Sequence, residues 1–408
     1  MIIPPIILSF CNMPTQTTSP LLCMQSSPDG SGQLSFAPIA LGFADTSATV
    51  TGLGHANGRL FAIFGSRWGK VYVSVLRERD LSPLFVQELP EVHDHHSVLP
   101  VGDCLYAVST GTDELLCYDV RENRLENCRV VWRASDAGRD THHINSVVEK
   151  DGEILVSAFG PKEGALWATS MNGYIYNVTA GTTVLKGIYH PHSLSVRNGR
   201  LYYSNSHSNT FCAADDPNPI FQLNGYTRGV TWLEDDIVCL ATSIGRRVSK
   251  STGLVANPAD PGEPAGESAI WLGDITTRQI LHSIDLSWFG PEVYDVLVLD
   301  GACLDLLSLS NASQIMERKA IQLLLSEIAD SHQKAQNLAM ESEAWQRTAA
   351  DATAQLNIIR NSRAWRLAEA LQRLRARLVP HGSSLARFAR RLLSLYAAAR
   401  ARLVRHDA

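Results

Sequence analysis

The stretch HPHSLSVRNGRLYYSNS, residues 190–206, decides the fold because it reads as a hairpin that recurs along the chain. Behind its polar start, alternating apolar residues lead to the turn dipeptide Asn198-Gly199 and then to a strand-like run at residues 201–203. Strand patterns on both sides of an Asn-Gly pair are a strong signal for two antiparallel strands joined by a tight turn. The stretch therefore predicts a β-hairpin that begins at a polar residue.

Five other stretches follow the same order of polar residue, strand, turn and second strand. They begin at Thr51, His96, Asn145, Arg228 and Tyr294, and with the start at His192 the steps are 45, 49, 47, 36 and 66 residues. The longest step contains a Pro- and Gly-rich insertion near residues 254–267. A period of about 40–50 residues with four short strands per unit is typical of β-propeller blades.

We therefore predict an all-β fold, a six-bladed β-propeller over residues 33–310, with five or seven blades as the alternatives. The sixth unit ends after two strands, and the early stretch 32–43 is expected to supply its missing strands and close the ring. Residues 1–32 are expected to form a disordered N-terminal extension.

Each repeated stretch is expected to supply the innermost strand of its blade, so that the starting residues surround one mouth of the central channel. The predicted ligand-binding rim is mixed and polar, with two imidazoles and one guanidinium. Its members are Thr51, His96, Asn145, His192, Arg228, Tyr294 and the adjacent Asp295. Arg228 suits a carboxylate or phosphate group on a bound ligand.

Histidines cluster just before three successive inner strands, at residues 93–96, 142–143 and 190–192. Converging imidazoles can hold a divalent metal, for which the candidate ligands are His96, His143 and His192, or can act as acid and base near neutral pH. The alternative is that they only hydrogen-bond exposed backbone at a wet channel. Their spacing matches no compact metal motif, so the metal hypothesis depends on the propeller.

Other sequence signals narrow the function classes. The chain has no GxSxG elbow, no phosphate-binding GxxxxGK[ST] loop and no GxGxxG dinucleotide fingerprint. Its eight cysteines include no CxxC pair, which favours free thiols in a reducing compartment over a disulfide scaffold. The sequence leaves open whether the protein is an enzyme.

The C-terminal part has a different composition. Glycine is absent between residues 302 and 381, and apolar residues recur at three- and four-residue steps, which predicts a helical segment over 311–359 that can self-associate as a coiled coil. Residues 360–408 carry twelve arginines and two acids, a net charge of +10, so the remainder carries −15. Such asymmetry indicates an anionic partner.

Two basic amphipathic helices are predicted within 360–408, separated by Pro380. An arginine-flanked apolar face with a tryptophan is typical of helices that lie on anionic lipid. The predicted membrane-binding residues are Arg363, Trp365, Arg366, Arg373, Arg377, Phe388, Arg390 and Arg391. A protein partner is the alternative, and nucleic acid is the least favoured because aromatic residues for base stacking are sparse.

The core resembles a bacterial family of conserved hypothetical, propeller-like proteins whose function is unassigned. The elements that carry the resemblance are PHSLSVRNGRLYYSNS, GYTRGVTW…CLATSIGR and PEVYDVLVL, and they cover about residues 90–305. The resemblance implies a propeller-like fold and no particular chemistry. The positions that match the family's elements are His192, Ser193, Thr227, Arg228, Gly229, Glu292, Tyr294 and Asp295.

The segment IIRNSRAWRLAEALQRLRARL is similar to the C-terminal tail of many bacterial surface-polysaccharide enzymes, in which a coiled coil precedes a Ser-x-x-Trp-Arg-Leu element. Here the element is Ser362, Trp365, Arg366 and Leu367, and the proline of the usual continuation is absent from residues 368–371. This resemblance implies association with the machinery that builds O-antigen or capsule at the cytoplasmic face of the membrane.

Together these observations favour a propeller binding module in the cytoplasm, attached peripherally to the inner membrane and associated with surface-polysaccharide assembly. It would bind a glycan, an anionic ligand or a protein at the His/Arg-lined channel mouth, with assembly proteins or anionic lipid as partners. The alternative is a metal- or His-dependent lyase or hydrolase that acts on a sugar or lactone at the same mouth.

Overall fold

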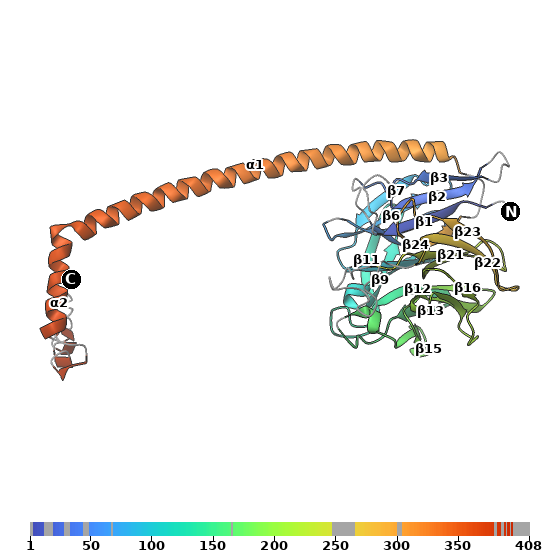
Figure 1. Cartoon of the computed structure of the whole chain (residues 1–408), viewed down its shortest axis with the longest axis horizontal. Helices are drawn as coiled ribbons and strands as arrows, with labels where there is room; N and C mark the ends of the chain where they lie inside the picture. The colour runs from blue at the N-terminus through green and yellow to red at the C-terminus, as the bar shows by residue number, and fades with distance from the viewer. Residues whose placement is uncertain are drawn as a thin grey trace. The chain divides into compact units, whose positions relative to one another are not determined.

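The structure is a computed structural model of the chain (Figure 1). It describes residues 3–11, 19–27, 33–43, 49–66, 68–164, 166–246, 266–299, 304–378, 382–384, 387–388, 390–391 and 393–394. The chain divides into two compact units, Met1–Leu324 and Leu325–Ala408. The first unit is a propeller-like arrangement of antiparallel sheets.

Four sheets have four strands each, and in each sheet the strands follow one another in sequence order. The first contains β4 (Thr49–Ala56), β5 (Arg59–Gly65), β6 (Val71–Arg77) and β7 (Pro83–Glu88), and the second contains β8 (His95–Val101), β9 (Cys104–Ser109), β10 (Glu114–Val120) and β11 (Leu125–Arg133). The third contains β12 (Ile144–Lys150), β13 (Glu153–Ala158), β14 (Gly173–Asn177) and β15 (Thr182–Ile188), and the fourth contains β16 (Pro191–Arg197), β17 (Arg200–Asn205), β18 (Thr210–Ala213) and β19 (Phe221–Gln222).

The remaining eight strands form one larger sheet. Its members are β20 (Tyr226–Trp232), β21 (Ile237–Ser243), β22 (Ala269–Asp274), β23 (Gln279–Asp285), β24 (Glu292–Val298), β1 (Ile6–Cys11), β2 (Leu21–Ser26) and β3 (Leu34–Pro38). The prediction of six separate blades is therefore not met: four sheets stand apart, and the last two hairpin units share a sheet because Ser243 of β21 pairs with Glu292 of β24.

The N-terminal strands correct a second prediction. Within the predicted disordered extension 1–32, the described residues form strands instead: β1 pairs with β24 on one side and with β2 on the other, and every residue of β1 and β2 is buried. Figure 1 shows these blue strands beside the last strands of the chain. Three N-terminal strands, and not the stretch 32–43 alone, complete the last unit, because β24 otherwise has an open edge.

The repeated turns form as their sequences predict. Asn57-Gly58, Asp151-Gly152 and Asn198-Gly199 all have positive φ at both residues, between 50° and 81°. Two positive φ values define the turn whose twist matches that of the flanking strands, and Asn, Asp and Gly adopt this conformation most readily. These turns set the register of each first hairpin.

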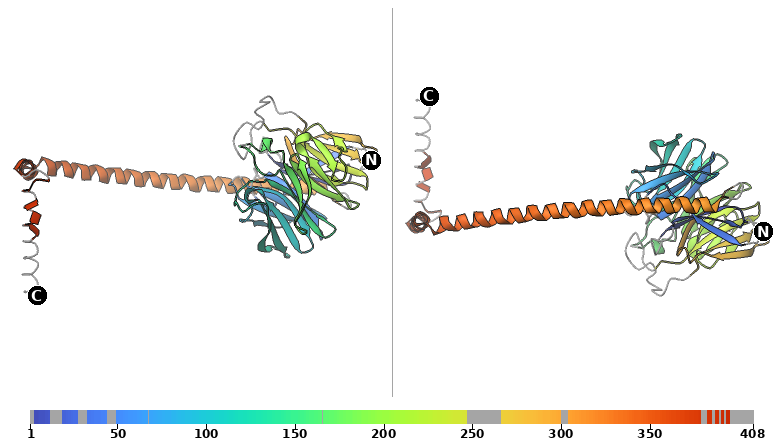
Figure 2. Two further views of the ribbon diagram at one scale, coloured as in Figure 1. Left: turned by 90° about the horizontal axis from the view of Figure 1, so that it is seen from below. Right: turned by 90° about the horizontal axis from the view of Figure 1, so that it is seen from above.

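The first strands of the hairpin units surround a common centre. β4, β8, β12, β16, β20 and β24 contact one another in this order, and β24 contacts β4, so the ring is closed. The approach is tight at two glycines: a Cβ on Gly52 would lie 2.7 Å from the Cα of Ser97, and one on Gly229 would lie 2.8 Å from the Cα of Asp295. Figure 2 gives two further views of these sheets.

Apolar side chains fill the spaces between neighbouring sheets. One cluster packs Phe61, Ile63 and Val73 of the first sheet against Leu105 and Leu116 of the second, and all five are buried. The outermost strands, such as β15 and β23, are mostly exposed. Packing between the sheets therefore holds the inner strands in position, and the polar starts of these strands are left to the centre.

Two helices follow the strands. α1 (Leu306–Asn361) covers the predicted helical segment, and α2 (Arg363–Leu378) covers most of the first predicted basic helix. Most of residues 379–408, where the second basic helix is predicted, lie outside the described part. Among the described helical residues, no segment is both long and apolar enough to cross a membrane. Self-association of α1 stays a prediction.

Candidate functional site

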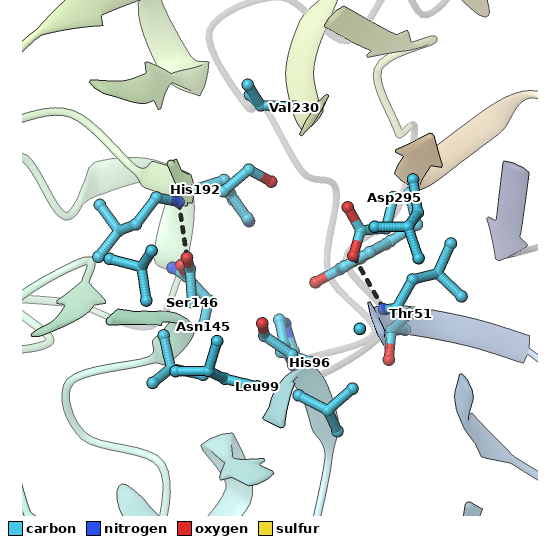
Figure 3. A pocket seen from close by; sticks show the side chains of 18 of the residues that line it. Thr51, His96, Leu99, Asn145, Ser146, His192, Val230 and Asp295 are labelled. Atoms are coloured by element: carbon cyan, nitrogen blue, oxygen red, sulfur yellow. Dashed lines mark hydrogen bonds between the residues drawn. The ribbon is translucent and has the colours of Figure 1, made fainter. Parts of the chain in front are cut away.

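A cavity of about 200 Å³ lies among the inner strands (Figure 3). Six of the seven predicted rim residues line it, namely Thr51, His96, Asn145, His192, Tyr294 and Asp295. Arg228 does not line the cavity, but its Cζ atom lies 4.4 Å from the ring centre of Tyr294, which does. The ring of inner strands thus brings together residues that are up to about two hundred and forty positions apart in the sequence.

His96 and His192 are held in the same way in two repeats. The Nδ1 atom of each lies within 3.1 Å of the carbonyl oxygen two residues earlier and 2.9 Å from a hydroxyl fourteen residues later. These hydroxyls, on Thr110 and Ser206, lie on the short 3₁₀ helices η1 (Thr110–Thr112) and η3 (Ser206–Ser208). A third such helix is η2 (Trp167–Thr169).

These contacts determine which ring nitrogen of His96 and of His192 carries the proton. A carbonyl oxygen only accepts, so Nδ1 of His96 and of His192 must be the donor. Thr110 and Ser206 donate their own hydroxyl protons to backbone carbonyls and are therefore free to accept from the rings. Burial lowers the pKa of His96 to about 3 and that of His192 well below its usual value. Both imidazoles are neutral, and Nε2 keeps a lone pair.

Asn145 occupies the equivalent position in the repeat between these histidines. Its Nδ2 donates to the carbonyl of His143, again two residues earlier, and its Oδ1 accepts from Ser157. The residues that supply the three carbonyls, Asp94, His143 and His190, have φ values of 50–53°. Since Asp, Asn and His tolerate this left-handed conformation, part of the histidine clustering is explained by backbone geometry alone.

Other cavity-lining polar groups join one inner strand to the next. Thr51 donates to the carbonyl of His95, Ser146 accepts from the backbone N–H of Leu194, and Asp295 accepts from that of Leu53. The last two bonds are drawn as dashes in Figure 3. Burial raises the pKa of Asp295 to about 7 although two backbone N–H groups favour its charged form. These side chains satisfy exposed strand edges, as the alternative without a ligand predicts.

Arg228 is different, because its buried Nε has no hydrogen-bond acceptor in the described part of the chain, although its charge helps to lower the pKa of Glu292. The side chain is 9% exposed, and its Cζ lies 5.1 Å from the ring centre of Tyr226 and 4.4 Å from that of Tyr294. Among the residues that the structure describes, none accepts a hydrogen bond from its guanidinium. The hydroxyl of Tyr294 is also buried without a partner in the described part. Stacking on tyrosines stabilises a guanidinium but satisfies none of its N–H groups.

Arg246 differs from Arg228, because its guanidinium is paired with a carboxylate. Arg246 donates from Nε and Nη2 to the two carboxylate oxygens of Glu292, at 2.8 and 2.6 Å. Although burial opposes it, this bidentate pair lowers the pKa of Glu292 to about 2. Cys11 also donates to Glu292. The buried carboxylate of Glu292, two residues before Tyr294, thus already has hydrogen-bond donors. Sequence reasoning missed Arg246 because it follows β21 and precedes no hairpin.

The predicted trio of metal ligands is not assembled. Within the described residues, the metal-compatible group whose ligand atoms lie within 4.8 Å of one another is Asp94, Asp140 and His143, so of the trio only His143 belongs to it. His96 and His192 do not belong to this group, and the Nδ1 atom of each is instead held by a backbone carbonyl and a hydroxyl. Asp140 accepts from His143 Nδ1 and from Trp167 Nε1, both at 3.0 Å, so the Asp140 carboxylate has hydrogen-bond donors within the protein.

The predicted membrane-binding residues lie on the second unit. Trp365 is 43% exposed, and Leu367, Leu371, Leu374 and Leu378 of α2 are exposed as well. The arginines of α2 are exposed, as are Phe388, Arg390 and Arg391. α2 therefore presents apolar and cationic side chains to solvent without burying any of them.

A family described as a domain of unknown function (DUF4915) matches residues 94–305. This agrees with the resemblance to a family of unassigned function seen over about residues 90–305, and it includes all the predicted rim positions except Thr51. No curated protein sequence matches the chain.

Solved structures with a similar arrangement include a chain of a nidogen/laminin complex, with 8% identity, 73% of this chain and 99% of that chain covered, and a TM-score of 0.48. A luciferin-regenerating enzyme has 12% identity over 60% of this chain and 78% of its own, with a TM-score of 0.45. The calcium-binding protein regucalcin of Agrobacterium tumefaciens has 14% identity, 58% and 74% coverage, and a TM-score of 0.39.

Proposed function

The chain belongs to the DUF4915 family, and we propose that it is a binding module whose channel mouth holds a small anionic ligand through Arg228. The observation that carries this proposal is the buried guanidinium without a hydrogen-bond acceptor in the described part of the chain. Burying an unpaired charge is strongly unfavourable, so such a group persists where a function requires it.

The chemistry of the site selects an anion. A guanidinium presents N–H groups in a planar fork that matches a carboxylate or phosphate, and stacking on Tyr226 and Tyr294 orients that fork. The unpaired hydroxyl of Tyr294 is a further donor beside it. The nearby carboxylate of Glu292 accepts its hydrogen bonds from Arg246, although the charge of Arg228 also helps to lower its pKa.

The eight-stranded sheet consists of two four-stranded halves, β20–β23 and β24 with β1–β3, and we take each half as one blade. Counted in this way, the propeller has six blades and the channel is lined by the first strand of each. The first strands of the six blades contact one another in a closed ring, which supports a single shared site rather than several separate ones.

The helical tail is the basis for a proposal about where in the cell the module acts. α2 has arginines and exposed leucines with Trp365, a combination that suits an anionic lipid surface. We propose peripheral attachment to the cytoplasmic face of the inner membrane, in association with proteins of surface-polysaccharide assembly. The support is the Ser362–Trp365–Arg366–Leu367 element and the charge of the tail.

An enzymatic function is the second candidate, and Asp295 is the observation that favours it. A carboxyl group with a pKa near 7 beside two neutral imidazoles can transfer protons at neutral pH, as lyases and hydrolases of sugars or lactones require. If a metal takes part, Asp94, Asp140 and His143 are its ligands. Stoichiometric metal in the purified full chain, lost in Asp140→Asn, would support this candidate.

The anion proposal is tested by thermal melting of the full chain with sodium phosphate, sodium glucuronate or sodium chloride at equal ionic strength. We expect at least one of the first two salts to raise the melting temperature above chloride, and Arg228→Met to abolish that difference. Arg200→Met is the matched control, because Arg200 is paired with Asp215 on the surface. Equal melting in all three salts would overturn the proposal.

A further inference from the structure

Two carboxylates and one imidazole converge just before the inner strands β8 and β12. The ligand atoms of Asp94, Asp140 and His143 all lie within 4.8 Å of one another. The ring centre of His143 is 4.9 Å from that of His96, which lines the cavity. The cluster therefore lies beside the cavity, and it includes none of the atoms on which the anion proposal depends.

Two of these side chains are spaced like neighbouring ligands of one metal ion. Nδ1 of His143 and Oδ2 of Asp140 are 3.0 Å apart. A zinc ion binds nitrogen and oxygen ligands at about 2.1 Å, so two ligands about 90° to 110° apart around the ion are separated by roughly 3.0 to 3.4 Å. The ion would replace the proton that these two atoms share. Asp94 completes the set by rotation of its exposed side chain.

The segment that carries Asp140 and His143 is held in place before any ion binds. Asp113 is fully buried and accepts hydrogen bonds from the three successive backbone N–H groups of residues 141–143. Trp167 donates from Nε1 to Oδ2 of Asp140. Outer partners that fix the orientation of a ligand raise the metal affinity of a protein site. Two of the three ligands are therefore preorganised.

The two carboxylates have no basic side chain as an ion-pair partner. Within the described residues, neither lysine nor arginine forms an ion pair with Asp94 or Asp140, although the charge of Arg246 acts on Asp94. Negative groups this close to each other repel, and a bound cation removes that repulsion. The cluster therefore favours an ion with more than one positive charge.

The kinds of ligand select the class of ion. An imidazole nitrogen suits transition metals such as zinc, whereas Ca²⁺ takes six to eight oxygen ligands and Mg²⁺ keeps several of its waters. Three protein ligands with a fourth position open are typical of zinc sites that act on a substrate. Asp94 is exposed, so solvent reaches this fourth position.

We propose that Asp94, Asp140 and His143 bind one Zn²⁺ ion or a similar divalent transition-metal ion, with one coordination position open beside the cavity. This inference rests on the second candidate function, for which it names the class of metal, and it does not depend on Arg228. A bound ion of this kind activates water or polarises a carbonyl group of a substrate.

The backbone of the cluster provides matched variants. Asp94 and His143 have φ values of 50° and 52°, which asparagine tolerates, so Asp94→Asn and His143→Asn are expected to keep the fold and to remove one ligand each. Asp140→Asn retains an oxygen that can accept from Trp167. Asp136→Asn is the control, because Asp136 is exposed and lies four residues before Asp140 but outside the cluster.

The experiment is calorimetric titration of the full chain, after treatment with a chelator, with zinc chloride, calcium chloride or magnesium chloride. We expect one equivalent of zinc to bind about tenfold or more tightly than calcium or magnesium. Each of the three cluster variants should weaken zinc binding about tenfold or more. Asp136→Asn and Arg228→Met should bind zinc as the wild-type chain does.

The outcomes separate this inference from the anion proposal. Zinc binding that all three cluster variants retain is adventitious, for example at thiols, and would overturn the inference, as would an absence of zinc binding or equal binding of calcium. Either result leaves the anion proposal standing. Conversely, a chain that binds zinc through the cluster but melts equally in phosphate, glucuronate and chloride keeps this inference and loses the anion proposal.

Discussion

The Cζ atom of Arg228 lies 4.4 Å from the ring centre of Tyr294, and neither the Arg228 guanidinium nor the Tyr294 hydroxyl has a hydrogen-bond partner in the described part of the chain. Both side chains are more than nine-tenths buried. Two adjacent buried donors without acceptors are unusual in a folded protein, where nearly all such groups are satisfied. The pair therefore has consequences for stability as well as for binding.

Arg228→Met is expected to stabilise the ligand-free protein by about 1 kcal/mol or more, because it removes a buried charged group whose Nε has no acceptor in the described part of the chain while retaining apolar contact with the tyrosines. The measurement is urea unfolding of the full chain without added anions. Arg246→Met is the control, because it is expected to change the free energy of unfolding in the opposite direction. It leaves Glu292 buried without its cation and should destabilise by roughly 3 kcal/mol. A loss of stability in Arg228→Met would contradict the argument.

Gly229→Ala and Gly52→Ala are each expected to destabilise the propeller by roughly 1–3 kcal/mol, since the new methyl group would meet backbone atoms of the neighbouring inner strand that cannot move aside. Gly164→Ala serves as the comparison, because Gly164 is exposed and the nearest atom is a side-chain hydroxyl 3.3 Å away. Denaturant midpoints for the three variants check the prediction. Similar midpoints would show that neighbouring inner strands can move apart to make room for a methyl group.

Acid is expected to destabilise the propeller through His96 and His192. Burial lowers the pKa of both in the folded state, to about 3 for His96, whereas the unfolded chain has a value near 6.5. Between these values the unfolded state binds more protons, so stability falls as pH drops below about 6.5. The variants His96→Asn and His192→Asn should each make the decline shallower, as measured by unfolding free energy at successive pH values.

Asp295→Asn is expected to change the pH dependence of stability in the opposite direction to the histidine variants, and the same pH series measures it. Burial raises the pKa of Asp295 to about 7 in the folded state, from an unfolded value near 3.8. The folded state therefore binds the extra proton between these values, and Asp295 alone stabilises the protein as pH falls through 7 toward 3.8. Without this carboxyl, the loss of stability in acid should become steeper, and an unchanged slope would show that Asp295 is ionised.

Charge reversal on α2, with Arg366→Glu and Arg373→Glu combined, is expected to reduce co-sedimentation of the full chain with anionic vesicles at least tenfold, since each basic residue near such a surface contributes about 1 kcal/mol. Added salt should weaken the wild-type binding in the same assay. Lys334→Glu, at an exposed position of α1, is the control. Equal sedimentation of wild type and the double variant would end the membrane proposal.

Much of the fold was predictable because its signals are local. The Asn-Gly and Asp-Gly turns impose positive φ values, and the alternating residues beside them define the hairpins. Once the hairpins are aligned, their starting residues are known, and six of the seven predicted rim residues do line one cavity. The exposed basic face of α2 was equally visible, because helical periodicity places the residues of a face at regular intervals.

The sequence by itself determined the hairpin repeats, the polar starts of the inner strands and the change to helix after the propeller, since each depends on neighbouring residues. Only the tertiary structure decided that β1 completes the sheet beside β24, that Glu292 forms a bidentate pair with Arg246, and that His96 and His192 present Nε2 rather than Nδ1. These outcomes depend on contacts between residues far apart in the chain, and no local pattern of residue types encodes which of several available partners a buried charge or strand edge will meet.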